Sequence, residues 1–189
     1  GIVQAVRGVS LTLRRGRTLG VVGESGSGKS VLSRSIMGLM PSNASRTGSV
    51  RFAGNELLNA PPKVMRQYWG DQMSMVFQDP MTALNPVVRV EQQITEGLHE
   101  HIDLTKDQAH DTALQLLESV GIPEPARRLR QYPHEMSGGM RQRIMIAIAL
   151  ACGPKLLFAD EPTTALDVTV QAQILDLLQA LQRDRQMAM

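Results

Sequence analysis

The stretch that decides the fold is Gly23-Glu24-Ser25-Gly26-Ser27-Gly28-Lys29-Ser30. It fits the pattern G-x-x-x-x-G-K-S/T and follows the apolar run Leu19 to Val22, which we expect to be a buried strand. Glycines let such a loop turn its backbone N–H groups toward a polyphosphate without interference from a Cβ. Lys29 is then expected to contact the β- and γ-phosphates, and Ser30 to contact Mg²⁺. The stretch therefore predicts a site for a nucleoside triphosphate.

The alternative is a glycine-rich turn that ends in Gly-Lys-Ser by coincidence. The amphipathic stretch Val31 to Met40 argues against it, because a helix directly after the loop would point its positive N-terminal end at the phosphates. A dinucleotide-binding fingerprint is excluded by the spacing, since the last glycine runs directly into Lys29.

Two acidic residues, Asp160 and Glu161, directly follow the apolar run Leu156 to Ala159, which predicts a strand. Open parallel sheets bind ligands at the carboxyl ends of their strands, so this pair lies where a nucleotide site is expected. A shared metal and water explain two adjacent acids better than the alternative, a solvated strand end. We predict that Asp160 is the carboxylate on the Mg²⁺ side and that Glu161 is the general base for an attacking water.

A third element has the sequence His134-Glu135-Met136-Ser137-Gly138-Gly139-Met140-Arg141-Gln142-Arg143. The stretch Ile144 to Ala151 that follows is hydrophobic all round, which suits a helix buried in a core. Ser137 stands where an N-cap would, and Gly138 and Gly139 leave the first N–H groups of the helix unshielded. The element predicts a second anion site, although Ser-Gly-Gly is also a common entry into a helix.

Two anion sites in one protein chain need an explanation, because the phosphates of one nucleotide require only one site. The two sites are explained if the nucleotide is held between two subunits, with Lys29 of one subunit below the phosphates and Ser137 and Gly139 of the other above them. A kinase that transfers a phosphoryl group would leave the second site without a function.

With these elements the chain resembles the nucleotide-binding subunit of an ATP-binding cassette (ABC) transporter. The matching elements follow the family's order and cover nearly the whole chain: the phosphate loop Gly23 to Ser30, the Q-loop glutamine Gln78, the signature Met136 to Met140, the acidic pair Asp160-Glu161 and the D-loop Ala165-Leu166-Asp167. The signature departs from the pattern of many members, because methionines stand at its first and last positions in place of leucine and glutamine.

The resemblance implies an α/β fold, a P-loop NTPase core with an antiparallel β edge and an inserted α-helical subdomain. It implies ATP and Mg²⁺ as cofactors. The residues implied in nucleotide binding are Gly23, Glu24, Ser25, Gly26, Ser27, Gly28, Lys29, Ser30, Ser137, Gly138, Gly139 and Asp167. Those implied at the metal are Ser30, Gln78 and Asp160, and those implied in catalysis are Glu161 and Gln78.

Within the family, three runs are similar to the dipeptide, oligopeptide and nickel importer branch: Val76 to Pro86, Tyr132 to Arg143 and Asp160 to Gln171. The resemblance implies that ATP hydrolysis drives uptake of peptides or nickel, and the sequence does not choose the solute. The implied partners are a second ABC ATPase subunit, identical or related, integral membrane permease subunits and, indirectly, a solute-binding protein. The implied location is the cytoplasmic face of the cell membrane.

The two ends of the sequence bear on two further features of the family. A switch histidine ends the strand after the D-loop helix, and an aromatic residue from an early strand stacks on adenine. The sequence stops at Met187-Ala188-Met189 and starts at Gly1 before either is reached. We therefore expect an internal part of a longer subunit, truncated at both ends, that hydrolyses ATP slowly or not at all by itself. Whether an iron–sulfur motif follows stays open.

Composition narrows the remaining alternatives. A formal net charge of +2 offers no broad basic field for nucleic acid, no run approaches a membrane span, and the single cysteine, Cys152, excludes a disulfide framework.

The alternative function is a nucleic-acid-associated ABC ATPase of the repair or chromosome-maintenance kind. Such proteins insert coiled coils or zinc modules before the signature, and this interval contains neither sustained heptads nor cysteines. We expect no nucleic-acid partner.

The motifs divide the chain into three parts. Residues 1–79 form the first part of the nucleotide-binding core, from the phosphate loop to the Q-loop. Residues 80–136 form the helical subdomain. Residues 137–189 contain the signature helix, the acidic strand end, the D-loop and the helix that follows it.

Within these parts the pattern predicts individual elements. Alternation at Val9 to Leu13 and Ser49 to Phe52 predicts the antiparallel edge, and Met73 to Phe77 predicts a buried strand that leads into the Q-loop. Helices are predicted at Val90 to Ile102, at Thr105 to Val120 and from Val168 to about Arg183.

Overall fold

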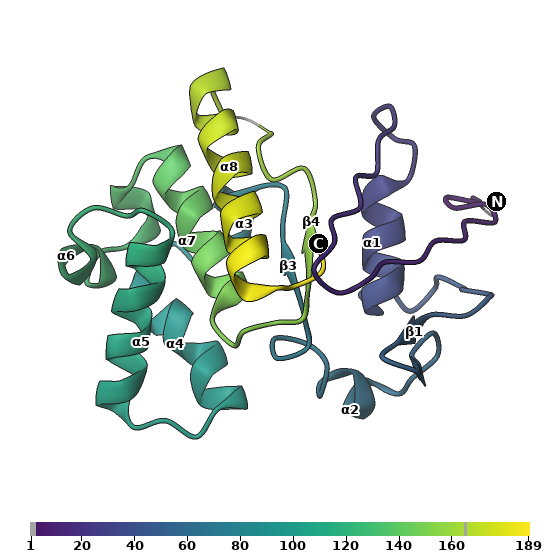
Figure 1. The fold of residues 1–189 in the computed structure, drawn as a ribbon, viewed down its shortest axis with the longest axis horizontal. Coiled ribbons are helices and arrows are strands. Elements are labelled where there is room, and N and C mark those ends of the chain that lie inside the picture. Colours follow the sequence, from purple (N-terminus) through teal and green to yellow (C-terminus); the bar gives the residue numbers. More distant parts are fainter. Residues whose placement is uncertain (1–2, 165) are drawn as a thin grey trace.

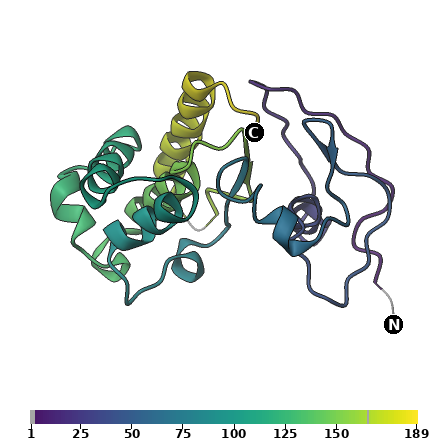
Figure 2. The same ribbon diagram turned by 90° about the horizontal axis from the view of Figure 1, so that it is seen from below.

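Two parallel strands lie at the centre of the structure, a computed structural model that describes residues 3–164 and 166–189. β3 (Met73–Val76) pairs with β4 (Leu156–Ala159). Helices cover both sides of this pair: α7 (Gly138–Leu150) and α8 (Val168–Arg185) lie on one side, and α1 (Lys29–Met37) lies on the other (Figures 1 and 2). The arrangement is an α/β fold, as predicted.

The other elements are short or belong to a helical group. They are β1 (Arg51–Phe52), β2 (Asn55–Glu56), α2 (Pro62–Met65), α3 (Pro80–Ala83), α4 (Val90–His101), α5 (Lys106–Ser119), α6 (Pro125–Leu129) and the 3-10 helix η1 (Pro133–Glu135). α4, α5 and α6 pack on one another, and both α4 and α5 pack on α7. In the part of the chain that the structure describes, no helix is both long and apolar enough to span a membrane.

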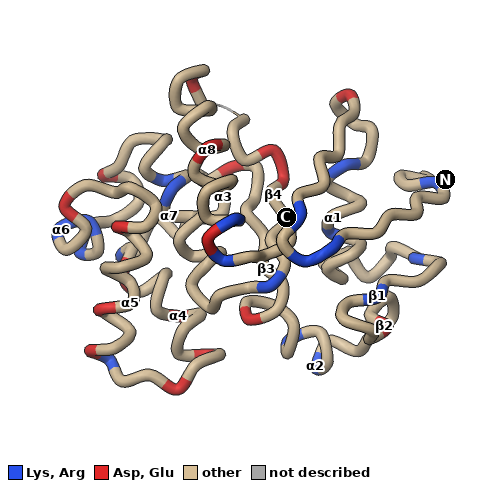
Figure 3. The backbone as a smooth tube through the Cα atoms, in the orientation of Figure 1, with Lys and Arg blue, Asp and Glu red and all other residues tan. Residues whose placement is uncertain are grey.

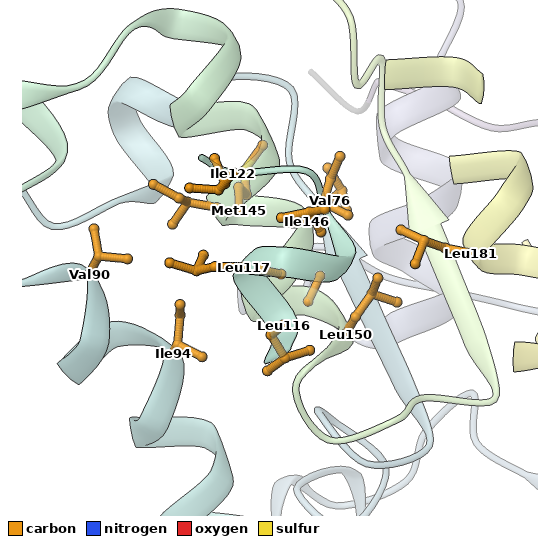
Figure 4. Close-up of a cluster of buried hydrophobic side chains, with 14 of the residues drawn as sticks. Val76, Val90, Ile94, Leu116, Leu117, Ile122, Met145, Ile146, Leu150 and Leu181 are labelled. Carbon is orange, nitrogen blue, oxygen red and sulfur yellow. The ribbon is translucent and has the colours of Figure 1, made fainter. Parts of the chain in front are cut away.

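The larger hydrophobic core joins this helical group to the central strands. Leu117 of α5, Ile146 of α7 and Val76 of β3 are fully buried in it (Figure 4). Ile174 of α8 and Leu157 of β4 are also fully buried there. Each such side chain contributes roughly 1.5–3 kcal/mol when it leaves water. The predicted buried helix after the signature is confirmed, because α7 supplies buried side chains around its whole circumference.

A smaller core lies on the opposite side of β3, beneath α1. Its buried members are Met37, Leu57, Met65, Met73 and Met75. Trp69 packs against this group, and its indole Nε1 donates a hydrogen bond to the carbonyl oxygen of Met37 at 2.8 Å. Flexible methionine side chains fill irregular gaps well, which suits a region built from loops and short elements.

The predicted long helices are confirmed to within a residue or two at their ends. α5 begins with a capping box, in which Thr105 accepts the backbone N–H of Gln108 and the Gln108 side chain accepts the backbone N–H of Thr105. These two bonds satisfy N–H groups that have no partner inside the helix. Thr105 is therefore the N-cap of α5.

The backbone ladder continues beyond β4 through residues that are not assigned to strands. Ala188 donates to the carbonyl oxygen of Lys155 at 2.8 Å and accepts from Leu157 at 2.9 Å. Met189 accepts from Leu19 at 2.8 Å and donates to Arg17 at 3.0 Å. The last residues of the chain thus lie between β4 and the segment that leads to the phosphate loop.

The buried strand predicted at Leu19 to Val22 is wrong. Its backbone is not a strand, and the side chains of Leu19, Val21 and Val22 are 40%, 51% and 97% exposed. Only the start of the run reaches the ladder, through Met189, and residues 20–22 make no backbone hydrogen bond to the described residues. An apolar run needs a paired strand and a covering layer to become a buried strand, and residues 20–22 have no such strand beside them among the described residues.

The predicted antiparallel edge is confirmed only as a small hairpin. β1 pairs with β2 through a tight turn in which Ala53 and Gly54 both have positive φ, 48° and 87°. Val9 to Leu13, predicted as part of this edge, is not a strand, and Val9 and Leu11 are 52% and 45% exposed. The alternation of apolar and polar residues predicted a strand here, but no strand forms because the segment has no hydrogen-bonded neighbour among the described residues.

The packing of α8 predicts different costs for two leucines of the same helix. Leu178, 2% exposed in the larger core, should cost about 2–5 kcal/mol of unfolding free energy when replaced in Leu178→Ala. Leu175 is 47% exposed, so Leu175→Ala is the matched control and should cost less than about 1 kcal/mol. Urea unfolding monitored by circular dichroism measures both values. Equal losses would mean that α8 packs through a different face.

Candidate functional site

The phosphate loop leads directly into α1, and its last glycine starts the helix. Gly28 is the N-cap, with φ 93° and ψ 10°, and no side chain caps the first N–H groups of α1. A Cβ at Gly28 would lie 2.5 Å from the carbonyl oxygen of Ala5, so no other residue fits without a shift of the backbone. The loop therefore presents uncapped N–H groups beside the positive end of the helix dipole, as an anion site requires.

Lys29 folds back over this loop. Its ammonium group donates to the carbonyl oxygens of Gly23 at 2.9 Å and Glu24 at 3.0 Å, and it lies 3.3 Å from Oε1 of Glu161. The side chain is only 20% exposed. A positive charge is thus held beside the loop predicted to bind phosphates, next to the acidic end of β4.

Ser30 joins the phosphate loop to that acidic end. Its hydroxyl donates to Oδ1 of Asp160 at 2.7 Å, across 130 positions of sequence. Asp160 is 5% exposed, and its second oxygen, Oδ2, is buried without a hydrogen-bond partner among the described residues. A buried carboxylate oxygen without a partner is costly, so this atom marks a place where a cation fits.

Gln78 and Glu161 meet because β3 and β4 are parallel. The register pairs Val76 with Ala159, and each of the two polar residues lies two positions further along its own chain segment. The Gln78 amide donates to Oε2 of Glu161 at 3.0 Å. The acidic residues lie directly beyond β4 (Figure 3), at the carboxyl edge where the sequence placed them.

Thr164 also contacts Glu161 and is not among the residues predicted from the sequence. Its hydroxyl donates to Oε2 of Glu161 at 3.1 Å, and its backbone N–H donates to the carbonyl oxygen of Glu161 at 3.1 Å. A sequence pattern that could have indicated Thr164 is a residue with a side-chain hydroxyl three positions after a carboxylate, within a turn.

The signature residues lie at the start of α7, away from the phosphate loop. Ser137 is the N-cap, and its hydroxyl accepts the backbone N–H of Met140 at 3.4 Å, as predicted. A Cβ at Gly139 would lie 3.0 Å from Val170 of α8, and one at Gly138 would lie 3.7 Å from Leu166. The signature glycines therefore pack closely against the D-loop and the start of α8.

Asp167 completes this second group as the N-cap of α8, where its carboxylate accepts the backbone N–H of Val170 at 3.0 Å. Ala165, the first residue assigned to the D-loop, lies outside the described residues. No hydrogen bond or ion pair of the described residues joins this group to the phosphate loop, and α7 and α1 lie on opposite sides of the strand pair (Figures 1 and 2). The chain thus carries two separate groups of predicted site residues.

A charged group next to the signature has a shifted pKa. The backbone N–H of Tyr132, which donates to Glu135 at 2.7 Å, holds the pKa of that carboxyl below its usual value. The same hydrogen bond closes the turn of η1, which leads into Ser137.

Comparison with known protein families shows which family this sequence resembles. The model of the ABC transporter family matches residues 6–164. The chain is 55% identical over 185 residues to the oligopeptide transport ATP-binding protein OppD of Bacillus subtilis (strain 168), covering 97% of this chain and 52% of that protein. It is 53% identical over 184 residues to OppD of Salmonella typhimurium, covering 97% and 55%.

A third relative, the dipeptide transport ATP-binding protein DppD of Bacillus subtilis (strain 168), is 55% identical over 185 residues, covering 97% of this chain and 55% of that protein. The chain therefore spans about half the length of these curated relatives.

Solved structures give the same fold. A dimeric post-hydrolysis state of the ATP-binding cassette MJ0796 bound to ADP and Pi matches with a TM-score of 0.83 at 27% identity, covering 95% of this chain and 75% of that one. Another dimeric structure of MJ0796, described as a bacterial ABC transporter cassette, matches with a TM-score of 0.82 at 27% identity, with the same coverage. With a family model that matches most of the chain, the predicted family is confirmed: the chain belongs to the ABC transporter family.

Proposed function

We propose that this chain is the ATP-binding part of a peptide importer and that it hydrolyses ATP between two subunits. The observation that carries the proposal is the convergence of the phosphate loop and the acidic strand end, joined by the bond from Ser30 to Asp160. The relatives support the solute class, because their names are those of oligopeptide and dipeptide transport proteins. They give no comparable support to nickel or to the nucleic-acid alternative.

In this proposal the phosphate chain lies along the loop from Gly23 to Gly28, with Lys29 at the β- and γ-phosphates. Lys29 would then exchange its contact with Glu161 for a stronger one with phosphate oxygens. The uncapped N–H groups of α1 supply further donors. The loop and the lysine together bind and orient the nucleotide.

Mg²⁺ fits the donors beside the loop. Oδ2 of Asp160 is buried without a hydrogen-bond partner among the described residues, and the Ser30 hydroxyl is bonded to the other oxygen of the same carboxylate. Gln78 can offer its amide oxygen, since its amide nitrogen is bonded to Glu161. Among the described residues there is no cluster of three or more His, Cys, Asp or Glu, which agrees with an ion that takes most ligands from phosphate and water. Bound there, Mg²⁺ would neutralise charge on the phosphates.

Glu161 is proposed as the general base. Its carboxylate accepts the proton of a water, the water oxygen bonds to the γ-phosphorus, and the oxygen that bridges the β- and γ-phosphates leaves with ADP. ATP and water thus give ADP and phosphate. Glu161 faces Lys29 at 3.3 Å, so its Oε1 is on the side where the γ-phosphate would be held.

The signature group is proposed to act on the nucleotide of a second subunit. Ser137, Gly138 and Gly139 form a compact surface with Asp167 at the start of α8, separate from their own chain's phosphate loop. The dimeric cassette structures that match the fold support a two-subunit arrangement. The second subunit can be an identical or a related chain.

Membrane permease subunits are the proposed partners of the helical region, at the cytoplasmic face of the membrane. Three apolar side chains in or after the Q-loop are exposed, Phe77 at 39%, Met81 at 63% and Val87 at 78%. Exposed apolar side chains such as these could be covered by a partner protein. A solute-binding protein would act indirectly, through those permease subunits.

In the complete subunit, Glu161→Gln should lower ATP turnover by about 10²- to 10⁴-fold while leaving ATP binding intact, because it removes the base and keeps the shape of the site. Phosphate release gives turnover and calorimetry gives affinity. Lys29→Ala is the control, since it should lose nucleotide binding itself. A Glu161→Gln protein that hydrolyses ATP at the unchanged rate would contradict the role of Glu161.

Ser137→Arg should spare ATP binding to one subunit and block ATP-dependent pairing of two, because the large cation would occupy the surface that meets the partner's phosphates. Light scattering after size exclusion, in the Glu161→Gln background, measures the pairing. Thr105→Arg is the matched control, because it changes the exposed N-cap of α5 and should leave pairing unaffected. Loss of ATP binding by the single Ser137→Arg subunit would count against action in trans.

A further inference from the structure

The carboxylate of Glu161 has three partners, and they divide between its two oxygens. Oε1 lies 3.3 Å from the Lys29 ammonium. Oε2 accepts the Gln78 amide at 3.0 Å and the Thr164 hydroxyl at 3.1 Å. The side chain of Glu161 is 36% exposed, so packing alone does not fix its direction. Its hydrogen bonds therefore decide which oxygen faces the phosphate loop.

Two of these partners have other proposed roles. Lys29 belongs to α1 and is the proposed ligand of the phosphates, and Gln78 follows β3 and is a proposed metal ligand. The nucleotide would compete with Glu161 for Lys29, and the metal ion would compete with it for Gln78. During hydrolysis neither Lys29 nor Gln78 would then hold Glu161 in place.

Thr164 differs because it belongs to the same turn as Glu161. Its backbone N–H donates to the carbonyl oxygen of Glu161 at 3.1 Å, so the turn that brings the hydroxyl to Oε2 is itself hydrogen-bonded. The contact does not depend on how β3 or α1 moves relative to β4. It also has no proposed competitor among the phosphates or the metal.

Glu161 is one of four described residues other than glycine that have a positive φ. Its φ is +47°, in the left-handed region that residues other than glycine adopt only where the surroundings hold them there. Such strain is concentrated at functional sites, where it sets the direction of a side chain. The bonded turn to Thr164 supplies part of what holds this conformation.

We propose that Thr164 is a positioning residue for hydrolysis: its hydroxyl holds Oε2 of Glu161, so that Oε1 faces the γ-phosphate and receives the proton of the attacking water. This inference rests on the proposed function. Thr164 is exposed, and its one side-chain hydrogen bond to the described residues goes to Glu161. Removing the hydroxyl therefore tests positioning with little effect on packing.

The test compares Thr164→Val, which removes the hydroxyl and keeps the shape, with Thr164→Ser, which keeps the hydroxyl, both in the intact protein. Thr164→Val should lower kcat by about 5- to 50-fold, below the roughly 100-fold that a 1 Å misplacement can cost, with KM for ATP changed less than about twofold. Thr164→Ser should recover most of the rate. Thr163→Val is the matched control, because Thr163 lies in the same turn and its hydroxyl bonds to none of the described residues.

A second comparison separates positioning from a structural role. In the Glu161→Gln background, Thr164→Val should change the residual rate less than about twofold, because there is no base left to position. Equal kcat for the unchanged protein and Thr164→Val would overturn this inference but not the proposed function. The same holds if Thr163→Val lowers kcat as much as Thr164→Val does, or if Thr164→Val lowers the rate as much in the Glu161→Gln background as in the unchanged protein. Absence of turnover in the unchanged complete subunit would overturn the proposed function, and this inference with it.

Discussion

The parallel register of β3 and β4 is the constraint on which the rest of the structure depends. It places Gln78 and Glu161 at one edge, each two residues beyond a paired position, and it lets the two faces of the pair carry two different cores. The core on the α7 side ties the helical group to the strands, and the core on the α1 side supports the phosphate loop. A change of register would separate the glutamine from the acid and would also exchange the buried faces.

The site at this edge balances opposite charges within a small space. Asp160 is buried against Ser30, while Glu161 lies nearer the surface between Lys29 and Gln78. The two adjacent acids thus have different surroundings, and this difference supports the different roles proposed for them. The buried acid, with one unpartnered oxygen, suits a metal ion, and the more exposed acid can reach a water.

The sequence predicted the parts of the fold that depend on local patterns. The helices α4, α5 and α8 have apolar periodicity, and α5 and α8 also begin with capping residues, Thr105 and Asp167. The phosphate loop and the acidic strand end follow from spacing. The predicted strands at Leu19 to Val22 and Val9 to Leu13 failed because a strand depends on a hydrogen-bonded neighbour, which alternation does not specify. Thr164 was missed because its role follows from the turn at Glu161, whose positive φ has no signature in the residue type.

The most direct test of the central claim, that the phosphate loop and Asp160 form one Mg²⁺–ATP site, is the Mg²⁺ dependence of ATP affinity in Asp160→Asn. Calorimetry with Mg²⁺ and with EDTA gives the ratio of the two affinities, and circular dichroism checks that the variant is folded. The account predicts that Mg²⁺ tightens ATP binding to the unchanged protein by about tenfold or more, equivalent to about 1.4 kcal/mol, and that Asp160→Asn loses this gain. The same gain in both proteins would contradict it.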